Sequence, residues 1–234
     1  MKGVILAAGR SSRLYPLTID TPKPLLEIGD QSIIERSLRL MQDAGIFDVV
    51  VVVGFQQEKV RQALADRVRF VVNPFYATTN NMASLWFAIP EMQGEDFIYV
   101  HGDVIYHESL LERMVKDPTK HGISLLIDYG PVDEEAMKVR TSGGNFVESS
   151  KDIPLSEAAG EWTGLTRFSA SATTELSNTI EALLLSGAYQ RYDTAAFNQL
   201  AQNNMPFHLL ATDGLPWCEI DTKEDLDRAR GLFQ

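Results

Sequence analysis

Cysteine is almost missing from this sequence of 234 residues, where Cys218 is the single occurrence. One cysteine cannot form an intramolecular disulfide, which suits a reducing compartment, so we expect a cytoplasmic protein. The apolar neighbours of Cys218 predict a buried structural thiol rather than a nucleophile. Long hydrophobic runs are also missing. None reaches the roughly 18 residues that a membrane-spanning helix needs, and we expect no membrane partner.

Basic residues are scarce relative to acidic ones. The chain has 21 Lys and Arg against 32 Asp and Glu, which gives a net charge of -11 and a pI near 4.8. Such a surface repels phosphate backbones, so we expect no nucleic acid partner. An acidic protein that handles nucleotides needs local cations, either Lys and Arg side chains or a divalent metal. Histidine is rare as well, and we interpret the four histidines as structural or surface residues because they show no ligand spacing: His101, His107, His121 and His208.

Apolar segments of strand length alternate with amphipathic segments of helix length. The expected strands are Gly3–Ala8, Val49–Val53, Val68–Val72, Phe97–His101 and Ile123–Asp128. The expected helices between them are Ser32–Ala44, Gln56–Ala65, Asn81–Met92 and Glu108–Val115. A strand such as Val49–Val53 is apolar on both faces, which favours a parallel sheet covered by helices. The sequence therefore predicts an α/β fold with a doubly wound, mostly parallel, Rossmann-like sheet.

The length favours one domain over residues 1–234, because 44% of the residues are hydrophobic and the chain is short for two cores. The alternation weakens after Asp128. We expect residues 130–165 to form a small substrate or lid subregion within the domain. The remaining expected elements are strands at Met137–Arg140, Asn145–Glu148, Trp162–Phe168, Pro206–Ala211 and Trp217–Ile220, and helices at Ser171–Leu185, Thr194–Asn203 and from Thr222 onward.

A loop of small residues follows the first expected strand directly. The candidate nucleotide-binding residues here are Leu6, Ala7, Ala8, Gly9, Arg10, Ser11, Ser12 and Arg13. Small residues let the backbone approach a ligand, and the N–H groups of such a loop can hold anionic oxygens. The two arginines add positive charge and bidentate donors for phosphate. By itself the loop is equally consistent with a turn that carries two solvated arginines.

Lys23 lies between Pro22 and Pro24. Proline fixes φ and has no N–H, so we expect this lysine on a stiff extended support that presents it as a fixed cation. A surface Pro-Lys-Pro turn is common, but its combination with the Gly9 loop at this spacing is not.

These residues together resemble the signature of the nucleotidyltransferase superfamily that includes sugar-phosphate nucleotidylyltransferases. The matching segments are Leu6–Gly9, Arg13–Leu14, Pro16–Thr18, Pro22–Leu25, Val53–Phe55, His101–Asp103, Glu161–Leu165 and Glu219–Leu226. The resemblance thus extends over nearly the whole chain. Ser11 stands where many sugar-acting members have a second glycine, so the chain departs from the simple sugar-nucleotide pattern.

Asp103 and Asp221 each follow an apolar run, at the expected carboxyl end of a strand, where open α/β sheets bind ligands. Two such carboxylates could converge on one Mg²⁺ ion. Asp221 could equally belong to the start of the helix that follows it. The resemblance assigns the metal to both aspartates and places Gly102 beside it. It also makes Asn81 and Ser84 candidate readers of the base, although an asparagine at this position could simply cap the helix.

The resemblance implies in-line attack by a phosphate or phosphonate oxygen of the acceptor on the α-phosphorus of a nucleoside triphosphate, with release of pyrophosphate. No protein nucleophile is needed, so catalysis rests on positioning and charge neutralisation. We expect Mg²⁺ on Asp103 and Asp221. Arg13, the loop amides and Arg10 would hold the β- and γ-phosphates, and Lys23 would neutralise charge at the α-phosphate or the acceptor.

Two segments, Asn73–Tyr76 and Asn80–Leu85, bear on the identity of the acceptor. They resemble segments of the small bacterial cytidylyltransferases that act on choline phosphate and on phosphonates such as 2-aminoethylphosphonate. CTP is therefore the expected donor, a small phosphoryl or phosphonate compound the expected acceptor, and a monomer or homodimer the expected assembly. The candidate acceptor-binding residues are Lys151, Glu161, Trp162, Tyr192 and Asp193, because aromatic faces and carboxylates attract ammonium groups. Simpler interpretations exist: Trp162 and Tyr192 as core residues, Asp193 as a helix cap, and Lys151 as a solvated lysine.

Three other functions stay open. A sugar-1-phosphate nucleotidylyltransferase with another nucleotide would turn over hexose phosphates and show no preference for cationic acceptors. A non-catalytic nucleotide-binding regulatory protein of the same fold would release no pyrophosphate, but Lys23, Asp103 and Asp221 together argue against it. A dinucleotide-dependent dehydrogenase would need glycines where Ser11 and Leu14 stand.

Overall fold

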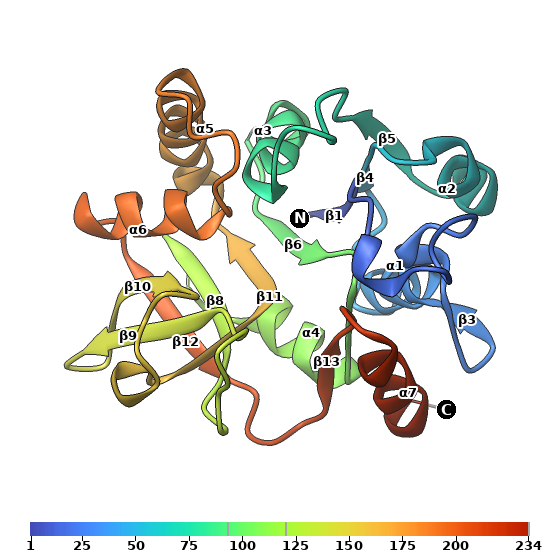
Figure 1. The fold of residues 1–234 in the computed structure, drawn as a ribbon. Coiled ribbons are helices and arrows are strands. Elements are labelled where there is room, and N and C mark those ends of the chain that lie inside the picture. Colours follow the sequence, from blue (N-terminus) through green and yellow to red (C-terminus); the bar gives the residue numbers. More distant parts are fainter. Residues whose placement is uncertain (93, 120, 234) are drawn as a thin grey trace.

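The computed structural model describes residues 1–92, 94–119 and 121–233, and it has an α/β architecture around one large sheet (Figure 1). The sheet runs in the order β10-β9-β11-β6-β1-β4-β5, with β8 paired to β11 and β12 paired to β8. Its strands are β1 (Lys2–Ala7), β4 (Val49–Val53), β5 (Arg69–Val72), β6 (Phe97–His101), β8 (Ile123–Asp128), β9 (Lys138–Ser142), β10 (Asn145–Ser150), β11 (Gly160–Phe168) and β12 (Phe207–Ala211).

Seven α-helices are assigned in the described ranges: α1 (Ile33–Asp43), α2 (Gln57–Leu64), α3 (Asn81–Met92), α4 (Glu108–Lys116), α5 (Ala170–Leu185), α6 (Thr194–Gln202) and α7 (Lys223–Leu232). None of them is both long and apolar enough to cross a membrane. The predicted bounds of α3, β4, β6 and β8 agree with these elements, and most other predicted ends differ by one or two residues.

Strand β4 explains why the sheet has helices on both faces. Its five valines are all buried, and alternate side chains point to opposite faces of a strand. Val50 and Val52 pack in one core with α3, whereas Val49, Val51 and Val53 pack in a second core with α1 and α2. The strands β6, β1, β4 and β5 are mutually parallel. The predicted α/β fold with a mostly parallel central sheet is thus confirmed.

The other half of the sheet is mixed. Strand β11 runs antiparallel to β6, β8 and β9. The segment expected as a small subregion contains the β9–β10 hairpin, which continues the main sheet through β11. Its turn contains Gly143 and Gly144, both at positive φ, where glycine avoids the strain that a Cβ would cause. Asn198 of α6 holds β10 through two hydrogen bonds to the Ser149 backbone.

A separate two-stranded ribbon was not expected. Strand β7 (Val104–Tyr106) pairs antiparallel with β13 (Trp217–Glu219), and the backbone N–H of Ile220 donates to the carbonyl of Asp103 at 2.9 Å. The smallest strands, β2 (Glu27–Ile28) and β3 (Gln31–Ser32), form a short hairpin. The β7–β13 ribbon has a direct consequence for function, since it brings the segment after β13 beside the end of β6.

Candidate active site

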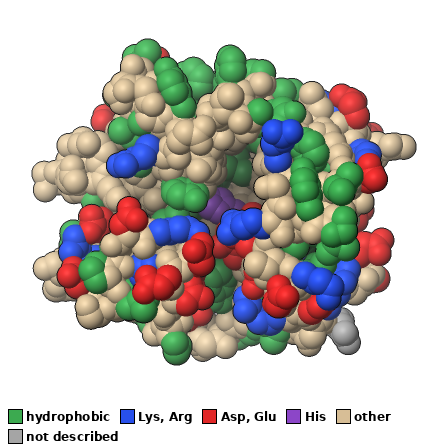
Figure 2. All heavy atoms as spheres, in the orientation of Figure 1, with side chains coloured by type: hydrophobic (Ala, Val, Ile, Leu, Met, Phe, Trp, Pro, Cys, Tyr) green, Lys and Arg blue, Asp and Glu red, His purple; other side chains and the backbone are tan. Residues whose placement is uncertain are grey.

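A cavity of about 340 Å³ opens where β1 and β6 end, between the parallel half of the sheet and the β9–β11 region. Figure 2 shows it as a hollow near the middle of one face, with a histidine inside and basic side chains at its edge. Of the predicted site residues, the cavity is lined by Leu6, Ala8, Gly9, Ser11, Ser12, Arg13, Lys23, Asn81, Ser84, Asp103, Lys151, Trp162, Tyr192 and Asp221. The lining residues that were not among the predicted site residues include Tyr76, Thr79, Asn80, His101, Met137, Gly164 and Glu219.

The small-residue loop after β1 leaves its backbone open to a ligand. A Cβ at Gly9 would contact nothing within 4 Å. Ser11 has φ +52°, in the left-handed region that favours glycine, so a glycine would suit this position. The Thr18 hydroxyl donates to the carbonyl of Ser11 at 2.8 Å and so fixes the loop from behind.

Three predicted loop and turn residues lie outside the cavity lining. Ala7 is buried in β1, and the exposed Arg10 side chain lies 5.9 Å from the centre of the Phe55 ring. Gly102 has a packing role, because a Cβ there would stand 2.3 Å from the carbonyl oxygen of Leu6. The end of β6 can approach β1 this closely only with glycine at position 102.

Lys23 connects the two predicted metal-binding carboxylates. It is buried at the start of a 3₁₀ helix (Lys23–Leu25), rather than on the extended support expected from its prolines. Its Nζ donates to Asp103 Oδ2 at 2.7 Å and to Asp221 Oδ1 at 2.8 Å. Arg13 Nη2 lies 2.6 Å from the other oxygen of Asp221. The structure thus brings the four predicted catalytic residues into one charged cluster.

Burial by itself would lower the pKa of Lys23, but the charges of Asp103 and Asp221 raise it above its usual value. The same cation, with help from His101, lowers the pKa of the buried Asp103 carboxyl despite its desolvation. Lys23 therefore stays an ammonium ion and Asp103 a carboxylate at neutral pH. A fixed positive charge is thereby held at the cavity surface next to the small-residue loop.

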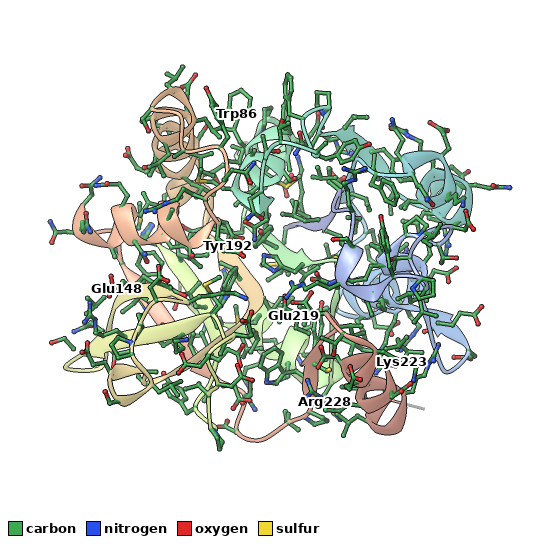
Figure 3. The ribbon with its side chains drawn as sticks, viewed as in Figure 1. Trp86, Glu148, Tyr192, Glu219, Lys223 and Arg228 are labelled. Carbon is green, nitrogen blue, oxygen red and sulfur yellow. The ribbon has the colours of Figure 1, made fainter. Side chains whose placement is uncertain are left out.

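Glu219 and His101 are functional candidates that sequence reasoning missed. One donor atom from each of His101, Asp103 and Glu219 can be chosen so that all three lie within 4.8 Å of one another. Burial, and then the charges of Asp103 and Asp221, raise the pKa of Glu219 to about 7. Figure 3 shows Glu219 near the centre of the molecule, whereas Lys223 and Arg228 lie farther out on α7. One imidazole nitrogen and two carboxylates are donor groups that divalent cations bind.

Asn81, one of the two residues predicted to contact the nucleotide base, already makes hydrogen bonds within the protein. Its Nδ2 donates to Asp193 Oδ1 at 3.2 Å, and its Oδ1 accepts from the Asp193 backbone N–H at 2.9 Å. The Ser84 hydroxyl accepts from Asn73 Nδ2 at 3.0 Å and can still donate. The hydroxyl of Thr79, which also lines the cavity, already donates to the carbonyl of Phe75 at 2.9 Å and accepts from Asn73 Nδ2 at 3.1 Å. Of the two predicted base readers, Ser84 is therefore the one with hydrogen-bonding capacity to spare.

On the acceptor side, Asp193 does not lie on the cavity surface. Its side chain is fully buried, where it accepts hydrogen bonds from the Tyr99 hydroxyl, from Asn81 and from the Thr194 backbone at the start of α6. The structure thus contradicts the expectation that Asp193 faces an acceptor. One carboxylate oxygen caps the helix while the other enters a buried polar cluster, so neither remains for a ligand.

Trp162 and Tyr192, the two aromatic residues predicted to bind the acceptor, differ in their exposure to solvent. Trp162 is almost fully buried, and its Nε1 donates to Thr166 Oγ1 at 3.1 Å. Tyr192 is partly exposed and lies across the cavity region from Glu219 (Figure 3). Lys151 Nζ lies 6.0 Å from the centre of the Tyr192 ring and 3.3 Å from Glu135 Oε2. The ring of Tyr192 therefore already has a cation of the protein near it.

Glu161 lies beside the cavity rather than in its lining, and it provides a test of the local electrostatics. Burial, with a smaller contribution from Asp133, raises its pKa from 4.5 to about 7. The folded state then holds a proton that the unfolded state has lost, so the free energy of unfolding falls as pH rises from about 4.5 to 7. Glu161→Gln cannot ionise and should lose this dependence.

We expect the melting temperature of Glu161→Gln, relative to wild type, to be higher at pH 8 than at pH 5, as measured by circular dichroism. Glu175→Gln, at an exposed position of α5, is the matched control and should show the same difference at both pH values. An equal difference for Glu161→Gln at the two pH values would contradict the raised pKa.

Comparison with known proteins places this geometry among enzymes. Residues 3–134 match the family described as MobA-like NTP transferase domain. Over 97% of its length the chain is 26% identical to the CTP:phosphoglutamine cytidylyltransferase of Campylobacter jejuni, and the match covers 98% of that protein. Over its whole length it is 25% identical to the CMP-5'-(3-aminopropyl)phosphonate synthase of Streptomyces rubellomurinus, of which it covers 39%.

Among solved structures, the CTP:phosphocholine cytidylyltransferase of Streptococcus pneumoniae superposes with a TM-score of 0.83 at 23% identity. The match covers 100% of this chain and 99% of that one. At this identity the likeness shows a shared fold.

Proposed function

Since the chain belongs to the MobA-like NTP transferase family and is a nucleotidyltransferase, we propose that it moves CMP from CTP to a small phosphorylated or phosphonate metabolite and releases pyrophosphate. The observation that carries the proposal is the cluster of Arg13, Lys23, Asp103 and Asp221 beside the small-residue loop. The names of the C. jejuni and S. rubellomurinus relatives support CTP as donor and a phosphoryl or phosphonate group as acceptor. The single cysteine favours a cytoplasmic enzyme.

The nucleotide would lie along the loop after β1. The backbone amides near Gly9 would hold phosphate oxygens, and Arg13 would turn from Asp221 to the β- and γ-phosphates. This movement is open to Arg13 because its side chain is 58% exposed. Ser84 offers its hydroxyl to the base. The acceptor would enter from the side of Tyr192 and Met137, opposite the phosphate loop.

Charge neutralisation would accompany the transfer. A Mg²⁺ ion held by Asp103 and Asp221, with Glu219 as a further oxygen donor, would screen the negative charge of the phosphate oxygens. Lys23 is positioned to stabilise charge on the α-phosphate, since its ammonium is buried and held by two carboxylates. The acceptor oxygen is already anionic, so the protein needs no nucleophile, and the barrier falls mainly through positioning.

The test is a pyrophosphate-release screen of the four common ribonucleoside triphosphates against phosphocholine, 2-aminoethylphosphonate and hexose 1-phosphates. We expect CTP with a small phosphoryl or phosphonate acceptor to give the highest kcat/KM. Preferred turnover of UTP or GTP with a hexose 1-phosphate would replace the proposal by a sugar nucleotidylyltransferase. Nucleotide binding without pyrophosphate release from any pair would indicate a regulatory protein.

A further inference from the structure

His101 is the cavity residue that the proposed function leaves without a role. It ends β6, two positions before Asp103, and a ring nitrogen lies within 4.8 Å of carboxylate oxygens of Asp103 and Glu219. Ligands of an octahedral ion with bonds of about 2.1 Å stand about 3 Å apart when adjacent and about 4.2 Å when opposite. Small side-chain rotations would therefore let these three residues bind one ion.

One nitrogen of His101 is already committed. Nε2 lies 3.0 Å from Asp193 Oδ2 and 3.0 Å from the Tyr99 hydroxyl. Asp193 is itself fixed, because it caps α6 and is held by both polar atoms of the Asn81 amide. Histidines that bind metals usually donate their second N–H to a carboxylate, which fixes the tautomer and the ring orientation. Nε2 keeps its proton toward Asp193, so Nδ1 is the nitrogen that can exchange a proton for a metal.

A glycine packs beside Nδ1, where a side chain would press on the ring. Gly164 of β11 has φ +79°, and a Cβ there would stand 3.2 Å from Nδ1 and from Cγ of His101. This contact is tighter than side chains normally tolerate, so a larger residue would push the imidazole or cover the nitrogen. Glycine at position 164 keeps this side of the ring accessible from the cavity, which both residues line.

The carboxylate oxygens of the site fall into two groups, those paired with basic side chains and those without such a partner in the described part of the chain. Lys23 and Arg13 engage the two oxygens of Asp221, and Lys23 uses Oδ2 of Asp103. In the described part of the chain, no hydrogen bond or ion pair is made by the Glu219 carboxylate. While Arg13 pairs with Asp221, Glu219 and Oδ1 of Asp103 are the oxygen donors left to a cation near His101. When Arg13 turns to the phosphates, as proposed above, Oδ2 of Asp221 joins them.

We propose that His101, oriented by Asp193, is a direct ligand of the divalent metal together with Asp103 and Glu219, and that the site prefers a first-row transition ion such as Mn²⁺ to Mg²⁺. The inference rests on the metal requirement of the proposed function. Affinity for nitrogen-containing sites rises along the first transition series, whereas Mg²⁺ favours oxygen ligands and water. Coordination replaces a proton on the imidazole by the metal, so no other reactant is involved.

The test is pulsed electron paramagnetic resonance of the purified protein with Mn²⁺ as the probe. We expect electron spin echo modulation from a directly coordinated ¹⁴N in wild type and its loss in His101→Gln. We also expect His101→Gln to bind Mn²⁺ at least tenfold more weakly and to lose the preference for Mn²⁺ over Mg²⁺. His121→Gln, at an exposed position, is the matched control and should keep the nitrogen signal.

Asp193→Asn tests the orienting role, because asparagine keeps the ability to cap α6. We expect a variant that still folds, as checked by circular dichroism, and a Mn²⁺ affinity lowered about 10- to 100-fold, as for other partners of metal-bound histidines. Bound Mn²⁺ without nitrogen coupling in wild type would overturn the proposal even if a variant failed to fold. If wild type lacked nitrogen coupling but still released pyrophosphate, the histidine ligand would be refuted and the proposed transferase function would remain. If wild type showed nitrogen coupling but transferred no nucleotide, only the proposed function would be refuted.

Discussion

Replacing Lys23 by alanine is expected to slow pyrophosphate release at saturating substrate by about 100- to 1,000-fold, which corresponds to roughly 3–4 kcal/mol of transition-state stabilisation. The ammonium of Lys23 is buried and held at 2.7 and 2.8 Å by two carboxylates, so it needs no reorganisation when charge develops on the α-phosphate. A mobile surface lysine would lose much of this benefit to water and to side-chain entropy.

The measurement is kcat for CTP in a continuous pyrophosphate assay, with circular dichroism to check folding. Lys116→Ala removes an exposed lysine of α4 that pairs with Glu112, and it should leave kcat unchanged. Lys23→Arg keeps the charge but not the compact geometry, and it should fall between wild type and alanine. A Lys23→Ala enzyme within twofold of wild type would show that the lysine only holds Asp103 and Asp221 together.

Asp103→Asn and Asp221→Asn should each reduce turnover by about 100-fold or more, and an excess of chelator should abolish the activity of wild type. Each substitution removes a negative charge from the cluster that would hold the metal, while the amide keeps the size of the side chain. Asp221→Asn has a second effect that Asp103→Asn lacks, because Asp221 also pairs with Arg13.

Activity should be measured over a titration of Mg²⁺ and of Mn²⁺, since a weakened site can be refilled at high metal concentration. We expect both variants to need more metal than wild type for half-maximal rate. Asp213→Asn is the control, because this exposed aspartate pairs with Arg113 away from the cavity. Full activity of wild type in excess chelator would refute a metal requirement.

The elements that sequence reasoning located well are those whose signals are local. Val49–Val53 is apolar on both faces, and Ser32 with Glu35 forms a capping box at the start of α1. The small-residue loop and Lys23 could be predicted as site residues because they lie within one short segment that has a specific pattern. Such features depend on neighbours within a few positions, so the chain itself contains the information.

The errors came from contacts between distant segments. His101 shows no ligand spacing in the sequence, and it meets Glu219 because the β7–β13 ribbon places them together. The sequence allowed Asp193 both as a helix cap and as a pocket residue. The choice depended on its second oxygen, which binds His101 and Tyr99 of a strand far away in the chain. Neither partner could be identified without the fold.

The distance along the chain between Lys23 and Asp221, 198 positions, has a consequence for biosynthesis. A ribosome completes the phosphate loop, Lys23 and Asp103 long before it adds Glu219 and Asp221. The nascent chain can therefore form the parallel strands β1, β4 and β6 while β7 still lacks its partner strand β13. A polypeptide released before residue 219 would carry the small-residue loop, Lys23 and Asp103 but would lack Glu219 and Asp221, so the charged cluster is complete only after those two residues have been added.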